Sequence, residues 1–138
     1  MLPQEAQNRV VEFLAEPGWS PETWTVIAHY PTALSRVPMA AVLWPQVEEG
    51  VSMDLPAGYS TLTILVMVVG EIGDSPEAAR RGAERLYAAW RRLRAWPSGD
   101  LILRRIRAAP TGVEVLNIAG QACSGGMIEL TFQTVLTP

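Results

Sequence analysis

The chain begins with apolar positions that repeat at helical spacing. Between Pro3 and Ala15, four apolar residues fall on one face of a helix: Ala6, Val10, Phe13 and Leu14. Proline is favoured in a first helical turn, and a Pro-Gly pair at positions 17 and 18 marks an end. We therefore expect an amphipathic helix over 3–15.

Two short strand patterns and an acidic segment follow. Thr23–Tyr30 is rich in β-branched and aromatic residues, and the apolar stretch Met39–Trp44 lies between Pro38 and Pro45. Prolines at both limits favour a strand end or an edge over a sheet centre. Pro45–Tyr59 carries acidic but no basic residues, which predicts an extended acidic loop or a loose hairpin.

The clearest strand pattern is Ser60–Gly70. Its even positions from 62 to 68 are all apolar, and its odd positions turn apolar from Leu65 onward. A strand that is apolar on both faces needs cover on both. In so small a domain, another subunit can supply part of that cover.

A second, longer helix is predicted from Pro76 to Ala95. Asp74 or Ser75 can cap it, and proline suits its first position. Its apolar stripe consists of Ala79, Ala83, Leu86, Trp90 and Leu93.

The remainder reads as strands. Leu101–Ala108 is one, and Val113–Ala119 with Met127–Leu136 predicts a hairpin joined by Gly120–Gly126. The order of elements predicts a single α+β domain over residues 1–138, with a mostly antiparallel sheet flanked by two helices. A length of 138 residues and 49% hydrophobic content suit one packed core.

Composition excludes several classes of protein. The net charge of −3 does not indicate a dedicated nucleic-acid binder. The longest strongly apolar run, Leu62–Val69, is too short for a membrane helix, and the first residues lack a signal-peptide pattern. The single cysteine, Cys123, excludes an internal disulfide and suits a reducing compartment. We expect a soluble protein.

Charge is segregated along the chain. All eleven basic residues are arginines, and nine of them lie between positions 80 and 107 with only two acids, which gives this block +7. The remainder has two arginines and twelve acids, which gives −10.

Three interpretations of the arginine block are open. It is a solvated face, a nucleic-acid-binding surface, or a basic interface that meets an acidic surface on a neighbouring copy. Head-to-tail contacts of the third kind close into rings when the rotation allows. The candidate subunit or partner interface consists of Arg80, Arg81, Arg85, Arg91, Arg92, Arg94, Arg104, Arg105 and Arg107.

Candidates for catalysis are few. His29, the one histidine, falls in a predicted strand, and no Gly-x-Ser-x-Gly motif supplies a nucleophile for it. Cys123 is a candidate reactive thiol, but the ligand spacing of a zinc site is missing. Glu48, Glu49 and Asp54 are candidate acid–base groups with no nucleophile paired to them. We expect no enzymatic activity, no cofactor and no metal site.

The layout resembles the tail terminator proteins of long-tailed bacteriophages, the minor tail protein U type. The resemblance covers most of the chain. It rests on the helix Pro3–Ala15, the strand Thr61–Val69, the helix Pro76–Ala95 with its Leu-Trp-Leu stripe, and the closing run Ile128–Val135.

This resemblance implies a virion structural protein, assembled in the host cytoplasm, that forms a homohexameric ring at the head-proximal end of the tail. The ring stops polymerisation of the tail tube protein and offers a docking surface to the head-tail connector or neck protein. DNA passes through the hole without specific binding. The acidic loop, with Glu48, Glu49 and Asp54, is expected to face this lumen and repel DNA. The alternatives are a neck or head-completion adaptor protein and an arginine-rich nucleic-acid-binding accessory protein.

Overall fold

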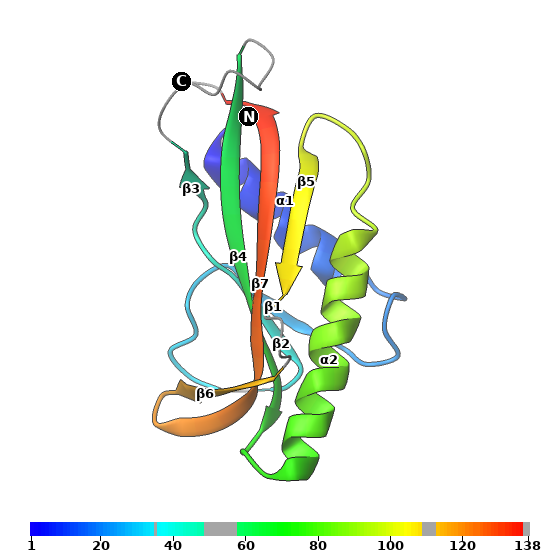
Figure 1. The fold of residues 1–138 in the computed structure, drawn as a ribbon, viewed down its shortest axis with the longest axis vertical. Helices are drawn as coiled ribbons and strands as arrows, with labels where there is room; N and C mark the ends of the chain where they lie inside the picture. Colours follow the sequence, from blue (N-terminus) through cyan, green and yellow to red (C-terminus); the bar gives the residue numbers. More distant parts are fainter. Residues whose placement is uncertain (35, 49–57, 109–112, 137–138) are drawn as a thin grey trace.

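Two long antiparallel strands form the centre of the structure, β4 (Tyr59–Ile72) and β7 (Gln121–Val135). The computed structural model describes residues 1–34, 36–48, 58–108 and 113–136. Figure 1 shows the two long strands running the length of the molecule. The other elements are α1 (Pro3–Ala15), β1 (Thr25–Ile27), β2 (Met39–Val42), β3 (Gln46–Val47), α2 (Pro76–Arg94), β5 (Ile102–Ala108) and β6 (Glu114–Ile118).

The seven strands form one mixed sheet around this pair. The main order is β1-β2-β4-β7-β5, while β3 pairs with β4 and β6 pairs with β7. Every pair is antiparallel except β1 with β2. The protein is thus an α+β domain with two helices and a mostly antiparallel sheet, which confirms the predicted fold class.

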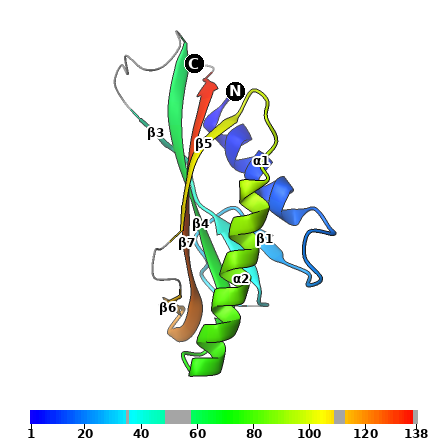
Figure 2. The same ribbon diagram turned by 45° about the vertical axis from the view of Figure 1, so that its right-hand side comes forward.

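Both helices pack on the same face of the sheet, as Figure 2 shows. The predicted bounds of α1 are confirmed, and its Val10 and Leu14 are buried in one cluster with Leu86 and Leu93 of α2. The sheet contributes the predicted even-numbered positions of β4 and the alternate residues of β7 to this cluster. The alternation read from the sequence therefore locates the main core correctly.

The second face of β4 is covered at one end by the chain itself. Met67 and Val69 lie in a separate buried cluster with Ile118 of β6 and Cys123 of β7. Leu34 and Val37, from the connection between β1 and β2, pack against that cluster. This part of the strand therefore needs no second subunit for cover.

The helix α2 packs on the sheet through a face that differs in part from the predicted stripe and contains a glycine. Its buried residues are Ala78, Gly82, Leu86, Ala89 and Leu93, whereas Ala83, which the stripe included, is exposed. A Cβ on Gly82 would lie 2.8 Å from the Cβ and carbonyl oxygen of Ser124. The predicted stripe is therefore correct at its two leucines and wrong at Ala83. The buried face passes through Gly82, where the absence of a side chain lets the helix approach the sheet closely.

The predicted loop Gly120–Gly126 is wrong. All of them except Gly120 belong to the strand β7, and the hairpin turns at Ala119 and Gly120, with φ values of 52° and 81°. Two successive positive φ values are typical of the tight turn that joins antiparallel strands. Gly125 lies inside the strand, where a Cβ would come 1.9 Å from the carbonyl oxygen of Val68. The glycines mark close strand packing here and not a loop.

The first strands are shorter than predicted. β1 covers only three residues of Thr23–Tyr30, and β2 ends at Val42. In the acidic segment Pro45–Tyr59, β3 pairs with β4, so the segment begins as one arm of a hairpin. Glu49 and Asp54 lie outside the described residues.

Candidate assembly surfaces

The nine candidate arginines do not form one surface. Four of them, Arg80, Arg81, Arg85 and Arg92, contact acidic residues of the same chain. Arg91 and Arg94 lie in the last turn of α2 beside aromatic rings, and the remaining three, Arg104, Arg105 and Arg107, lie on β5. The three groups have different surroundings and therefore different capacities for binding a partner.

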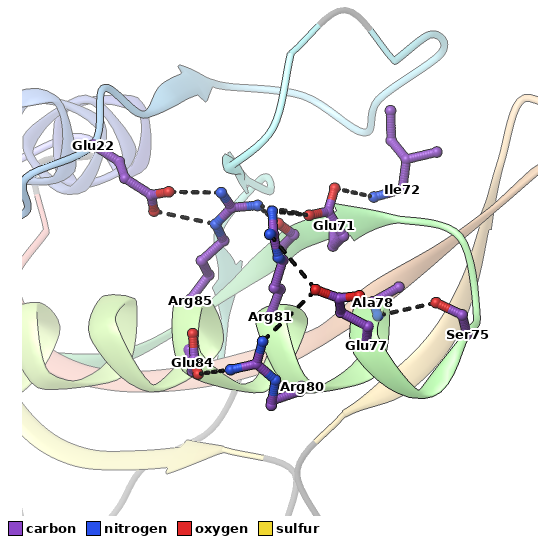
Figure 3. A network of polar contacts seen from close by, with 11 residues as sticks. Glu22, Glu71, Ile72, Ser75, Glu77, Ala78, Arg80, Arg81, Glu84 and Arg85 are labelled. Carbon is purple, nitrogen blue, oxygen red and sulfur yellow. Dashed lines mark hydrogen bonds and ion pairs between the residues drawn. The ribbon is translucent and has the colours of Figure 1, made fainter.

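Arg85 is the centre of the network in Figure 3. Its guanidinium binds both carboxylate oxygens of Glu22, with Nη2–Oε1 at 2.6 Å and Nε–Oε2 at 3.1 Å. Its Nη1 donates to the carbonyl of Gly70 at 2.5 Å and lies 3.4 Å from Glu71. The hydrogen bonds to Glu22 raise the pKa of Arg85 above its ordinary value. This side chain is committed to holding three segments of its own chain together.

Arg80 and Arg81 make more exposed pairs around the start of α2. Arg80 lies 3.2 Å from Glu84, and Arg81 lies 3.7 Å from Glu77. Such exposed pairs one turn apart stabilise a helix by only about 0.3–0.5 kcal/mol. The predicted cap is confirmed, because the Ser75 hydroxyl accepts from an N–H of the first turn at 3.1 Å.

Arg92 joins the two helices. Its Nε and Nη2 donate to the carbonyl of Phe13 at 3.1 and 2.9 Å, and Nη2 lies 2.5 Å from Glu16. Its guanidinium carbon lies 3.6 Å from the centre of the Phe13 ring. Carbonyls at the C-terminal end of a helix carry partial negative charge, so a cation is stabilised here. Much of the charge separation seen along the sequence is thus neutralised within one chain.

Arg91 and Arg94 lie beside aromatic rings of α2. Arg91 lies 5.8 Å from the Tyr87 ring and Arg94 4.7 Å from the Trp90 ring, and the two rings stack at 5.7 Å. Neither arginine forms an ion pair with any residue that the structure describes. Both are exposed and keep their charge available.

The arginines of β5 lie on an edge of the sheet. Arg105 pairs in register with Thr131, and Arg107 pairs with Glu129. Both arginines therefore share the side of the sheet that faces away from the helices. Arg104 lies where the register shifts by one residue, which indicates a β-bulge. On its outer side β5 has no strand partner among the described residues.

The opposite edge, at the same height, is β3. Glu48 directly follows it, and its N–H donates to the carbonyl of Thr61 at 3.0 Å. Glu48 is exposed, as are Val47 and Trp44, at 42% and 63%. Alternation along the strand places Glu48 and Gln46 on the side away from the helices.

Residue pairs form two rows across the four strands between these edges. One row is Gln46, Thr63, Thr131 and Arg105. The other is Val47, Leu62, Phe132 and Leu103. We call the surface between the edges, on the side away from the helices, the open face, and define it by Thr61, Thr63, Leu65, Glu129, Thr131 and Gln133. These six residues are half-buried, and no helix of the described chain packs over them.

The candidate catalytic residues are not brought together. His29 is exposed two residues beyond β1, with its Nδ1 2.9 Å from the carbonyl of Tyr30, so its predicted place in a strand is wrong. Cys123 is buried, and burial raises the pKa of its thiol. Within the described ranges, no group of three or more His, Cys, Asp or Glu residues is placed to hold a metal ion.

A shallow hollow lies between α2 and the connection from α1 to β1. Trp19, Ser20 and Pro21 line one side, and Ala88, Arg91 and Arg92 line the other. Its lining contains one charged side chain without an acidic partner among the described residues, Arg91.

No protein-family model matches the chain, and no curated protein matches it. Neither of the two described helices is long and apolar enough to cross a membrane.

Proposed function

We propose that this chain is a ring-forming tail terminator of a long-tailed bacteriophage. The observation that carries the proposal is the four-stranded section β3-β4-β7-β5. It has helices on one face only, and neither of its edges has a strand partner among the described residues. A sheet with two such edges offers each copy two different neighbours, as a ring requires.

The open face suits the wall of a hole through which DNA passes. Its one charged residue is Glu129, which pairs in register with Arg107 of β5, and its edges carry Arg105 on one side and Glu48 on the other. A wall without net positive charge does not hold the phosphate backbone. The helices are the bulkier layer, and they take the outside of the ring, where the circumference is larger.

Termination follows from unlike ring surfaces. One flat surface of the ring matches the last ring of tail tube protein, and the opposite surface does not, so no further tube subunit adds. That second surface is the docking site for the head-tail connector or neck protein. The finished ring lies in the virion, at the head-proximal end of the tail.

Electron microscopy of mixtures tests this proposal. Purified protein is incubated with tail tubes of the phage that encodes it, together with free tube protein. We expect one ring at one end of each tube and shorter tubes as the protein concentration rises. Tubes with bare ends and unchanged lengths would count against the proposed function.

One observation favours a nucleic-acid-binding function as the second candidate. Arg91 and Arg94 are exposed beside the stacked rings of Tyr87 and Trp90, an arrangement that suits contact with phosphates and bases. This function predicts binding to DNA that weakens steeply as salt rises. Absence of binding at low salt would eliminate it.

A further inference from the structure

The two edges of the four-stranded section are complementary to each other. We propose that copies of this chain join by pairing β5 of one copy with β3 of the next, which continues the sheet from subunit to subunit. The proposal rests on the proposed ring-forming function and names the surfaces that would build the ring.

Strand direction permits this pairing. Along the order β3, β4, β7 and β5, each strand is antiparallel to the one before it. Because the section contains four strands, β3 and β5 run in opposite directions. A neighbouring copy that is related by rotation about an axis parallel to the strands therefore brings its β3 alongside β5 of the first copy in the antiparallel direction.

Backbone groups are available on both edges. Glu48 donates to Thr61, so the alternation of an antiparallel pair directs the N–H and C=O of Val47 away from β4. In β5, every second residue directs its backbone groups away from β7 in the same way. No described residue forms a backbone hydrogen bond with these outward groups.

Side-chain charges select the head-to-tail combination. Arg105 and Arg107 on one edge and Glu48 on the other share the same side of the sheet. Pairing β5 with a copy of itself would place arginines against arginines, which is destabilising. Pairing β5 with β3 at the same height places Arg105 opposite Gln46 and diagonal to Glu48, within reach of its long side chain, while the bulge and arginines still prevent indiscriminate edge pairing.

The other end of the sheet lacks this complementarity. Its edges are β1, with no charged residue, and β6, whose one charged residue is Glu114. Nothing there distinguishes a neighbour of the right orientation from a wrong one.

Cross-linking tests the contact directly. The double variant Gln46→Cys/Ile102→Cys places one thiol on each edge, about 16 Å apart within a chain, across three strand spacings and two residues along the strands. A bis-maleimide spanning about 8 Å reaches between diagonal neighbours of a new strand pair but not across the sheet of one chain. We expect the double variant to give a ladder of multimers, and each single variant at most a dimer.

Charge reversal provides the second test. Arg105→Glu and Glu48→Arg should each raise the protein concentration for half-assembly at least tenfold, and the combined variant should restore it to within threefold. Arg91→Glu, with the same charge change on α2, is the matched control and should assemble normally. Weakening by Arg91→Glu with none by Arg105→Glu would overturn the proposal.

A backbone variant covers the case in which charge reversal prevents folding. Val47→Pro removes the outward N–H without removing a bond to β4, whereas Val47→Ala keeps it. We expect only the proline variant to block assembly, with both keeping the wild-type circular dichroism spectrum. Normal assembly of Val47→Pro would overturn the proposal.

The outcomes separate the two claims. Rings without a cross-linked ladder would contradict the β5–β3 contact and leave the proposed ring intact. Neither rings nor a ladder at any concentration, with or without tail tubes, would contradict both.

Discussion

Arg85 and Glu22 form a two-point ion pair between residues 63 positions apart in the chain. The pair attaches the middle of α2 to the connection between α1 and β1, and the same guanidinium binds the Gly70 carbonyl of β4. One side chain thus joins α2, the connection between α1 and β1, and the sheet. Arg85 is a candidate interface residue in the sequence, but in the folded chain it holds segments of the same chain together.

Replacing Arg85 should destabilise the fold. Arg85→Ala leaves Glu22 and the Gly70 carbonyl without their donor, so we expect a loss of about 1–3 kcal/mol in the free energy of unfolding. Arg85→Lys keeps the charge but not the fork, so it should recover only part of the loss. Urea unfolding measures both. Arg80→Ala, in an exposed pair, is the control and should cost less than about 1 kcal/mol; equal losses at positions 80 and 85 would contradict this account.

Gly82→Ala should also destabilise the protein, against the usual preference for alanine in helices. The new Cβ would meet Ser124 at 2.8 Å, so α2 must move away from β7. We expect a net loss of about 1–3 kcal/mol, as in other overpacked cores. Thermal unfolding followed by circular dichroism measures it.

The control for this substitution is the next residue. Ala83 is exposed, so Ala83→Gly should cost only the difference in helix propensity, about 1 kcal/mol. Increased stability in Gly82→Ala would show that the helix does not pack so closely on the sheet.

Gln7 is buried and joins α1 to the sheet. Its Nε2 donates to the carbonyls of Ala28 and Val42, both at 3.0 Å. Gln7→Leu keeps the size of the side chain but leaves two carbonyls without this donor, and should cost about 1–3 kcal/mol. Gln4→Leu on the exposed side of α1 should be nearly neutral. A neutral Gln7→Leu would mean that water or another donor replaces the amide.

The ion pair between Arg9 and Asp100 predicts a dependence on pH. Arg9 Nη1 lies 2.6 Å from Asp100 Oδ1, and this hydrogen bond lowers the pKa of the carboxyl. A carboxyl with a lowered pKa in the folded state stabilises the fold above its unfolded pKa of about 3.9 and loses that contribution as the pH falls through the folded value.

Comparison with Asp100→Asn tests this dependence. The wild type should have the higher Tm at pH 7, and the difference should shrink as the pH falls below about 4. A difference in Tm that stays constant down to pH 2 would contradict an ionic origin.

Periodicity alone predicts most of the fold. The bounds of α1, the two-faced pattern of β4 and the Ser75 cap of α2 follow from local spacing, because each depends on residues that are close in sequence. Two of the errors lie at glycines. Gly82 is absent from the predicted stripe and Gly125 falls in the predicted loop, but both mark places where backbones distant in sequence approach each other.

The candidate surfaces were harder to predict for the same reason. Counting charges locates the arginine block but not the partners of its members. Arg85 and Arg92 pair with Glu22 and Glu16, which precede them by 63 and 76 residues. Only the sheet order shows that Gln46 and Arg105 lie in one row on opposite edges, with Glu48 two residues along on the same side of the sheet. No spacing along the chain carries that relationship.

The central claim is that the chain assembles into a closed ring. Sedimentation velocity across a wide concentration range, with electron microscopy of the same samples and of mixtures with tail tubes, tests it most directly. The account predicts a discrete species near six times the 15.1 kDa chain mass, seen as rings, either free or on tube ends. A chain that stays monomeric at every concentration and leaves tube ends bare would contradict it.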